Sequence, residues 1–225
     1  MQRTGESGLE LLRNHLARPP LIITLELMIA PERIQDAGEY VEWLRLAVHE
    51  KSLPVGNRTR AAGSCYAIAQ DHHHSIVLLI DHQLYASSFS LLRSEFEAYV
   101  RGQWLAQCAT DAEVEKYIQG WEPPRMDQLL SAVEETPGFS EKVLSRVKSQ
   151  GWKTMCAYTH TGGLHIQRWN TSEAIEPNYP PEEVLEALAF AESIGAMSVL
   201  GFAELANDED LALRILNKVK ERAGK

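Results

Sequence analysis

The segment LLRSEFEAYVRGQWL places an arginine where a helix would present an apolar side chain. At positions −4, +3, +7 and +11 from Arg93 the chain carries Phe89, Phe96, Val100 and Trp104. A charge on such a stripe is costly unless it is paired or functional. Arg93 is therefore placed to reach an anion or another helix, or to form a buried ion pair. Alternatively it extends to the surface while Glu97 pairs with Arg101.

The segment CAYTHTGGLHIQRW carries a second group of polar side chains. His160 lies two residues before Gly162 and Gly163. Each glycine inside a helix costs about 1 kcal/mol relative to alanine, so the pair favours a helix break or a close approach of backbone or ligand. Histidine can take up and release a proton near neutral pH. His165 is five residues further on and does not share a helical face with His160.

Together these segments predict a site in which Arg93, Glu97 and His160 converge in catalytic roles. Arg93 needs an anionic partner in a partly buried place, and Glu97 is the nearest one in the sequence. His160 can act as general acid or base. Further ligand-binding side chains are expected from the same region of the chain, namely Lys153, Tyr158, His165 and Arg168.

The sequence predicts no resident cofactor and no metal centre in this site. His72, His73 and His74 point about 100° apart on a helix, so they cannot converge on one ion, and we expect them near a polar bend. Three widely spaced cysteines without a CxxC pair predict reduced thiols rather than disulfides or structural zinc. The chain has no dinucleotide-binding, P-loop, HExxH or GxSxG motif.

The elements that must position these residues are predicted to be helices throughout. Residues 21–29 are ambiguous between a helix and an extended arm. The stretch 58–108 contains no proline and predicts two long antiparallel helices with a bend near residues 81–82. Thr110 and Glu113 have capping-box spacing. Further helices are expected over residues 7–17, 32–50, 125–135, 140–150, 152–169 with a break at the glycine pair, 181–205, and from about 209 to 219.

The fold class is accordingly all-α, a multi-helix bundle built on the long antiparallel pair. The 225 residues predict a single helical domain, 1–225, with 57–225 as the core bundle and 1–56 as an N-terminal helical appendage. We expect a homodimer, because residues 21–29 and a later apolar stripe both need cover. That stripe consists of Ala187, Phe190, Ala191, Ile194 and Val199.

Charge and hydropathy argue against a nucleic-acid-binding, membrane-associated or secreted protein. The net charge of −9 argues against binding to nucleic acid or anionic membranes through overall charge. Residues 140–168 are nevertheless locally basic. The N-terminus has no apolar core of a signal peptide, and the longest apolar runs are about five residues, as at 76–80. We therefore expect a cytoplasmic protein that does not bind membranes.

A long helix pair carrying LLRSEFE, followed by a helix carrying AYTH, resembles bacterial all-helical families of unknown function that are grouped with the HEPN superfamily. The resemblance covers residues 58–169 and rests on Arg93, Glu97, Tyr158, His160 and the helix order. HEPN nucleases carry Arg, four to six residues and then His on one helix. The nearest spacing here, Arg45 and His49, has three residues between them. The resemblance implies homodimers and toxin–antitoxin or phage-defence settings.

Three functions remain open from the sequence. The first is a dimerising interaction or binding module with a protein partner. The second, implied by the HEPN resemblance, is a metal-independent ribonuclease. In it, Arg93 would hold the phosphate of RNA and stabilise the charge developing on it, His160 would be the general acid or base, and Glu97 would orient Arg93 or His160. The third is a helical metal or small-ligand site built from His74, Glu97 and His160.

Overall fold

The computed structural model describes residues 29–139 and 141–224, and every regular element among them is a helix. This confirms the predicted all-α, multi-helix fold class. The helices are α2 (Pro31–Val48), α3 (Asn57–Asp81), α4 (Tyr85–Gln107), α5 (Asp111–Ile118), α6 (Met126–Glu134), α7 (Val143–Thr159), α8 (Gly163–Gln167), α9 (Pro181–Ala206) and α10 (Glu209–Ala223).

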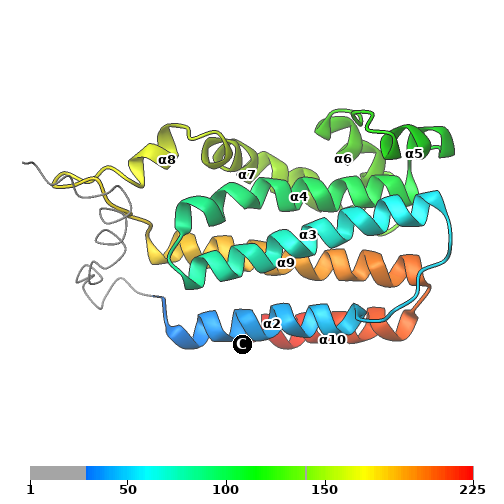
Figure 1. Cartoon of the computed structure of the whole chain (residues 1–225), viewed down its shortest axis with the longest axis horizontal. Coiled ribbons are helices and arrows are strands. Elements are labelled where there is room, and N and C mark those ends of the chain that lie inside the picture. The colour runs from blue at the N-terminus through cyan, green and yellow to red at the C-terminus, as the bar shows by residue number, and fades with distance from the viewer. Residues whose placement is uncertain (1–28, 140, 225) are drawn as a thin grey trace, which may run out of the picture.

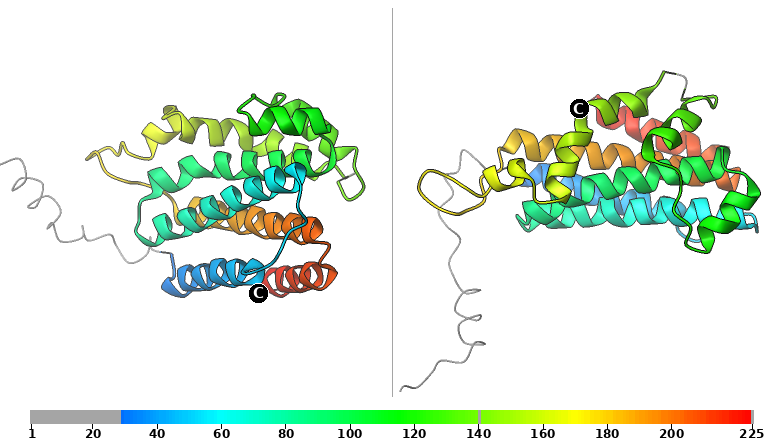
Figure 2. Two further views of the ribbon diagram at one scale, coloured as in Figure 1. Left: turned by 45° about the vertical axis from the view of Figure 1, so that its right-hand side comes forward. Right: turned by 90° about the horizontal axis from the view of Figure 1, so that it is seen from above.

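The helices stack in three layers (Figure 1). The middle layer contains the antiparallel pair α3 and α4, together with α9, which contacts both. Helices α2 and α10 cover one side of this layer through contacts with α9, and α7 and α6 cover the other side through contacts with α4. The left view of Figure 2 shows the same order, and both of its views show the α8 segment at one end of the bundle.

Three glycines let the helices of the middle layer approach closely. A Cβ atom on Gly102 of α4 would lie 2.5 Å from Cε1 of Tyr66, and one on Gly201 of α9 would lie 2.5 Å from Cζ of the same ring. A Cβ atom on Gly195 would collide with the ring of His73. Because any larger side chain would push the helices apart, Tyr66 and His73 of α3 fix the spacing to α4 and α9.

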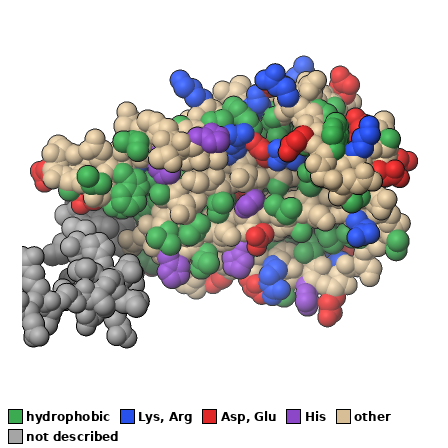
Figure 3. Space-filling view, turned by 45° about the horizontal axis from the view of Figure 1, so that its top comes forward, with side chains coloured by type: hydrophobic (Ala, Val, Ile, Leu, Met, Phe, Trp, Pro, Cys, Tyr) green, Lys and Arg blue, Asp and Glu red, His purple; other side chains and the backbone are tan. Residues whose placement is uncertain are grey.

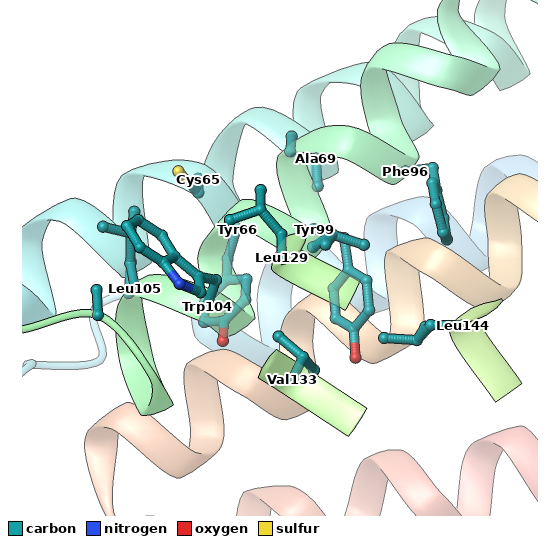
Figure 4. Close-up of a cluster of buried hydrophobic side chains, with 14 of the residues drawn as sticks. Cys65, Tyr66, Ala69, Phe96, Tyr99, Trp104, Leu105, Leu129, Val133 and Leu144 are labelled. Atoms are coloured by element: carbon teal, nitrogen blue, oxygen red, sulfur yellow. The ribbon is translucent and has the colours of Figure 1, made fainter. Parts of the chain in front are cut away.

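A large apolar cluster surrounds Tyr66 and joins the middle layer to α6 and α7 (Figure 4). Leu129 and Val133 of α6 and Leu144 of α7 enter it from one side, next to Tyr99. A second apolar cluster includes residues of α2, α3, α4, α7 and α9, so α2 and α7 are both anchored to the middle layer. This packing is what holds the predicted site residues of α4 and α7 next to one another.

Most of the predicted elements between residues 29 and 224 are confirmed. The 58–108 stretch forms α3 and α4, and Gln83 in the connecting turn has a left-handed φ of 57°. Thr110 and Glu113 form the predicted capping box at the start of α5. The helix predicted over 7–17, and all of the 21–29 segment except Ile29, lie outside the described residues.

Two local predictions were wrong. The stretch from 143 to 159 is one helix, α7, rather than two helices separated near residue 151, because Gly151 is tolerated where packing on α4 stabilises the helix. The three consecutive histidines do not mark a bend. They lie within α3, and His73 is fully buried against α9.

The apolar stripe of α9 does not need a second chain. Ala187, Ala191, Ile194 and Val199 are buried by helices of the same chain, and Phe190 packs against them. This part of the argument for a dimer was therefore wrong, because long-range packing covers the stripe. α9 is long and apolar enough to cross a membrane, and 56% of its most apolar window is buried inside the bundle.

The middle layer buries ionisable groups without partners among the described residues. Glu95 of α4 is 0% exposed, and neither of its carboxylate oxygens has a hydrogen-bond partner there. Burial raises the pKa of Glu95 well above its usual range, and it lowers the pKa of His73 to about 3. His73 is therefore neutral in the folded protein at neutral pH, and burial favours the neutral, protonated form of Glu95.

The raised pKa of Glu95 predicts a stability change with a defined pH dependence. The folded state retains a proton that the unfolded state releases, so this stability is full below the unfolded pKa, near 4.3, and is lost as pH rises toward the folded pKa. Glu95→Gln removes that loss. We expect it to raise the free energy of unfolding by about 1–3 kcal/mol at pH 8 and to change it little at pH 4.

Urea unfolding of both proteins at the two pH values measures the effect. Glu115→Gln is the matched control, because Glu115 is exposed on α5. An equal difference between wild type and Glu95→Gln at pH 4 and pH 8 would contradict the prediction.

Candidate functional site

Arg93 of α4 contacts the end of α7 through its guanidinium group. Its Nε donates a hydrogen bond to Oε1 of Glu97 over 2.7 Å, and its Nη1 lies 2.9 Å from Nε2 of His160. A guanidinium can only donate, so Nε2 of His160 must be the acceptor and the imidazole must be neutral in this arrangement. The structure thus brings together the three residues predicted to converge.

Glu97 is shared between two arginines. Its Oε2 accepts from Arg101 over 2.7 Å, while Oε1 accepts from Arg93. The side chains of Arg93 and Glu97 are 24% and 13% exposed, so the network lies at the surface of the bundle rather than in its core. Two cations and one carboxylate leave a net positive charge at this point.

The second helix of the site contributes an aromatic platform. The guanidinium carbon of Arg93 lies 4.7 Å from the ring centre of Trp152, and Nζ of Lys148 lies 5.2 Å from it. Nη1 of Arg93 also lies 3.6 Å from Sγ of Cys156. We call Arg93, Glu97, Arg101, Trp152 and His160 the α4–α7 cluster. In Figure 3, histidine, basic and acidic side chains adjoin one another on this side of the molecule.

The local sequence explains why His160 is exposed at the end of α7. His160 caps the helix, and Thr161 after it has a left-handed φ of 51°. A Cβ atom on Gly162 would lie 3.1 Å from Cα of Ala157, so the chain needs a small residue to turn back over the last helical turn. The predicted helix break at the glycine pair is therefore confirmed, and it leaves the imidazole next to Arg93.

The predicted ligand-binding residues do not join this cluster. Tyr158 is buried, with its hydroxyl 3.4 Å from Oε2 of Glu183 on α9, and burial raises its pKa to about 12. Arg168 pairs with the same carboxylate, donating from Nε over 2.8 Å. Nδ1 of His165 lies 2.9 Å from the Tyr158 carbonyl oxygen. Lys153 is exposed on α7.

These residues are therefore placed apart from the α4–α7 cluster, and their predicted role in ligand binding stays a prediction. Successive residues of a helix point in different directions, so Tyr158 faces α9 while His160 faces α4. His74 is also elsewhere, in a pocket lined by Val41 and Arg45 of α2. Among residues 29–139 and 141–224, no three His, Cys, Asp or Glu side chains are placed to hold a metal ion.

Sequence reasoning missed Trp152 and Cys156 as members of the site. Together with Lys148 and His160 they are spaced four residues apart, which places all four along one face of α7. That four-residue spacing was the feature of the sequence that could have placed Trp152 and Cys156 beside His160. It was missed because a helix break was predicted near residue 151.

Comparison with known proteins places the chain in a family without adding an activity. A sequence profile described as a family of unknown function, DUF6988, matches residues 66–223. No curated protein and no solved structure gives a significant match. The matched range begins in α3, ends with α10 and includes every residue of the α4–α7 cluster.

The contact between Arg93 and His160 predicts the tautomer of His160. Because Nε2 accepts a bond from the guanidinium, the proton of the neutral imidazole must be on Nδ1. Nitrogen-15 chemical shifts above pH 8 should identify the Nδ1–H form in wild type, and Arg93→Ala should release this preference. His82, exposed in the α3–α4 turn, serves as the internal control. A predominant Nε2–H form at His160 in wild type would show that the contact is absent.

Proposed function

The chain belongs to the DUF6988 family of unknown function, and from the α4–α7 cluster we propose that it is a binding module for the phosphate backbone of RNA. The observation that carries this proposal is the 2.9 Å contact between Arg93 and His160 at the surface. The guanidinium offers a bound phosphate a charged donor, and Nδ1–H of the neighbouring imidazole offers a second donor.

The composition of the surrounding surface supports RNA as the ligand. The chain has a net charge of −9, yet Arg93 and Arg101 gather around Trp152 and Glu97, and Lys148, which also pairs with Asp127 of α6, lies over the Trp152 ring. Cations beside an aromatic side chain suit single-stranded RNA, whose phosphates bind the cations and whose bases stack on rings. A purely structural ion pair would need neither the histidine nor the tryptophan.

A second candidate function is a metal-independent ribonuclease, as the HEPN resemblance implies. It is favoured by the position of His160, an exposed acid–base group directly next to the phosphate-binding guanidinium. Arg93 would stabilise the charge on the phosphorane-like transition state, while His160 would transfer the proton. The toxin–antitoxin or phage-defence setting is part of this second candidate.

Fluorescence anisotropy with a labelled single-stranded RNA in low salt tests the proposal. Arg93→Ala should weaken binding about 10- to 100-fold, the range for losing a charge-assisted hydrogen bond, and should reduce the salt dependence. Glu97 keeps its bond to Arg101 in this variant, so the stability loss should stay near 1 kcal/mol. Arg214→Ala on α10, where Arg214 is exposed, is the matched control.

The same RNA separates the two candidates. Under the ribonuclease candidate, wild type shortens the RNA without divalent metal, and His160→Ala abolishes cleavage while binding persists. Intact RNA with bound wild type supports the binding module alone. Equal affinity of wild type and Arg93→Ala would overturn both.

We also propose a homodimer that pairs through the outer face of α10. Leu213, Leu216 and Val219 are 58%, 43% and 37% exposed along this helix, and a two-fold pairing would cover them from both chains. Analytical ultracentrifugation at micromolar concentration should give twice the 25.3 kDa chain mass. Leu216→Lys should give the monomer, whereas Leu78→Lys on α3, where Leu78 is 50% exposed, should not. A monomeric wild type would refute the dimer.

A further inference from the structure

The flank of α7 that faces away from the α4–α7 cluster lines a pocket of about 500 Å³ between α4, α7 and α9. Phe89, Tyr158 and Phe190 supply aromatic walls, and Met155 and Leu164 supply aliphatic ones. The ring centres of Phe89 and Tyr158 are 4.8 Å apart, with the rings nearly perpendicular. The size and the largely apolar lining are those of a small-molecule site.

The polar groups of this pocket are acidic or neutral. Glu183 is neutralised by Arg168, whereas Glu186 is exposed on α9 at the rim of the pocket and has no partner within the described part of the chain. Among the described residues that line the pocket there is no lysine or arginine. None occurs between Arg168 and Arg214 in the sequence, a stretch that includes the whole α9 wall. The Tyr158 phenol remains neutral because its pKa is raised to about 12. Among the described lining residues, Glu186 is thus the carboxylate without a cationic partner.

A glycine keeps one wall of the pocket open. Gly151 lies in the interior of α7, where glycine lowers helix stability relative to alanine. A Cβ atom at this position would meet only Cε of Met155 at 3.7 Å, which is ordinary contact. Packing within the chain therefore does not require glycine here. Because Gly151 and Met155 both line the pocket, a larger side chain at 151 would occupy it.

We propose that this pocket binds a small organic cation with an apolar body, such as a primary amine or a quaternary ammonium compound. The apolar part lies among the aromatic rings, and the positive charge lies at Glu186. Aromatic faces attract cations as well as apolar groups, so the rings and the carboxylate select the same ligand. Gln150 and Thr154 at the pocket lining offer hydrogen-bond partners for an ammonium group. This pocket is independent of the RNA proposal.

Isothermal titration calorimetry with three probes that share one carbon skeleton tests the charge requirement. The probes are 4-phenylbutylammonium, 4-phenylbutanol and 4-phenylbutyrate, each titrated into the full chain at pH 7.5 in low salt. The ammonium probe should bind at least tenfold more tightly than the alcohol, and the carboxylate should bind least. Equal binding of ammonium and alcohol, or no binding of any probe at millimolar concentration, would overturn the proposal.

Substitutions then locate the bound probe. Glu186→Gln should reduce the affinity for the ammonium probe about tenfold, to the level of the alcohol, and leave the alcohol unchanged. Glu182→Gln is the matched control, since Glu182 is exposed on the same helix and does not line the pocket. Gly151→Leu should abolish binding of both probes.

Circular dichroism must show native helicity for Gly151→Leu. If that variant does not fold, Gly151→Ala should bind the ammonium probe more weakly than wild type while melting at the same or a higher temperature. Wild-type affinity in both Glu186→Gln and the folded Gly151 variant would place the probe elsewhere and refute the site.

Discussion

The close packing of α3 against α4 and α9 is the constraint on which the rest of the structure depends. Tyr66 and His73 insert at positions where α4 and α9 carry glycine, so the three helices approach more closely than larger residues would permit. The cost is that the Tyr66 hydroxyl and both His73 nitrogens are buried without a hydrogen-bond partner among the described residues. This close packing fixes the position of α4 relative to α3 and α9. It thereby also fixes where α4 presents Arg93 and Glu97.

Buried charged groups in this bundle are either paired with an opposite charge or shifted toward their neutral form. Between α2, α9 and α10, Glu192 is largely buried but accepts from both Arg33 and Arg222, so every charge in that network is paired. Glu95, in contrast, is buried without a hydrogen-bond partner among the described residues, and burial raises its pKa and so favours its neutral form. The α4–α7 cluster lies between these extremes. It is partly exposed. Arg93 forms an ion pair with Glu97, but the imidazole that it also contacts carries no negative charge.

Helix α7 separates two chemically different surfaces. One face carries Lys148, Trp152 and His160 toward α4, and the other lines the pocket with Tyr158 and Gly151 toward α9. Both faces depend on the helix remaining unbroken through residue 151 and ending at His160. Packing on α4 secures the first condition, and the tight turn over Ala157 at Gly162 secures the second.

The sequence by itself determined the helical fold class and the α3–α4 pair, and it singled out Arg93, Glu97 and His160 as polar residues in apolar or glycine-rich surroundings. Those features follow from local periodicity, breakers and the cost of placing a charge on an apolar stripe, all of which are properties of neighbouring residues. Only the tertiary structure decided that α7 is continuous, that Tyr158 and Arg168 face Glu183 and that the α9 stripe is covered by its own chain. These depend on contacts between residues far apart in the sequence, where packing free energy outweighs local propensity.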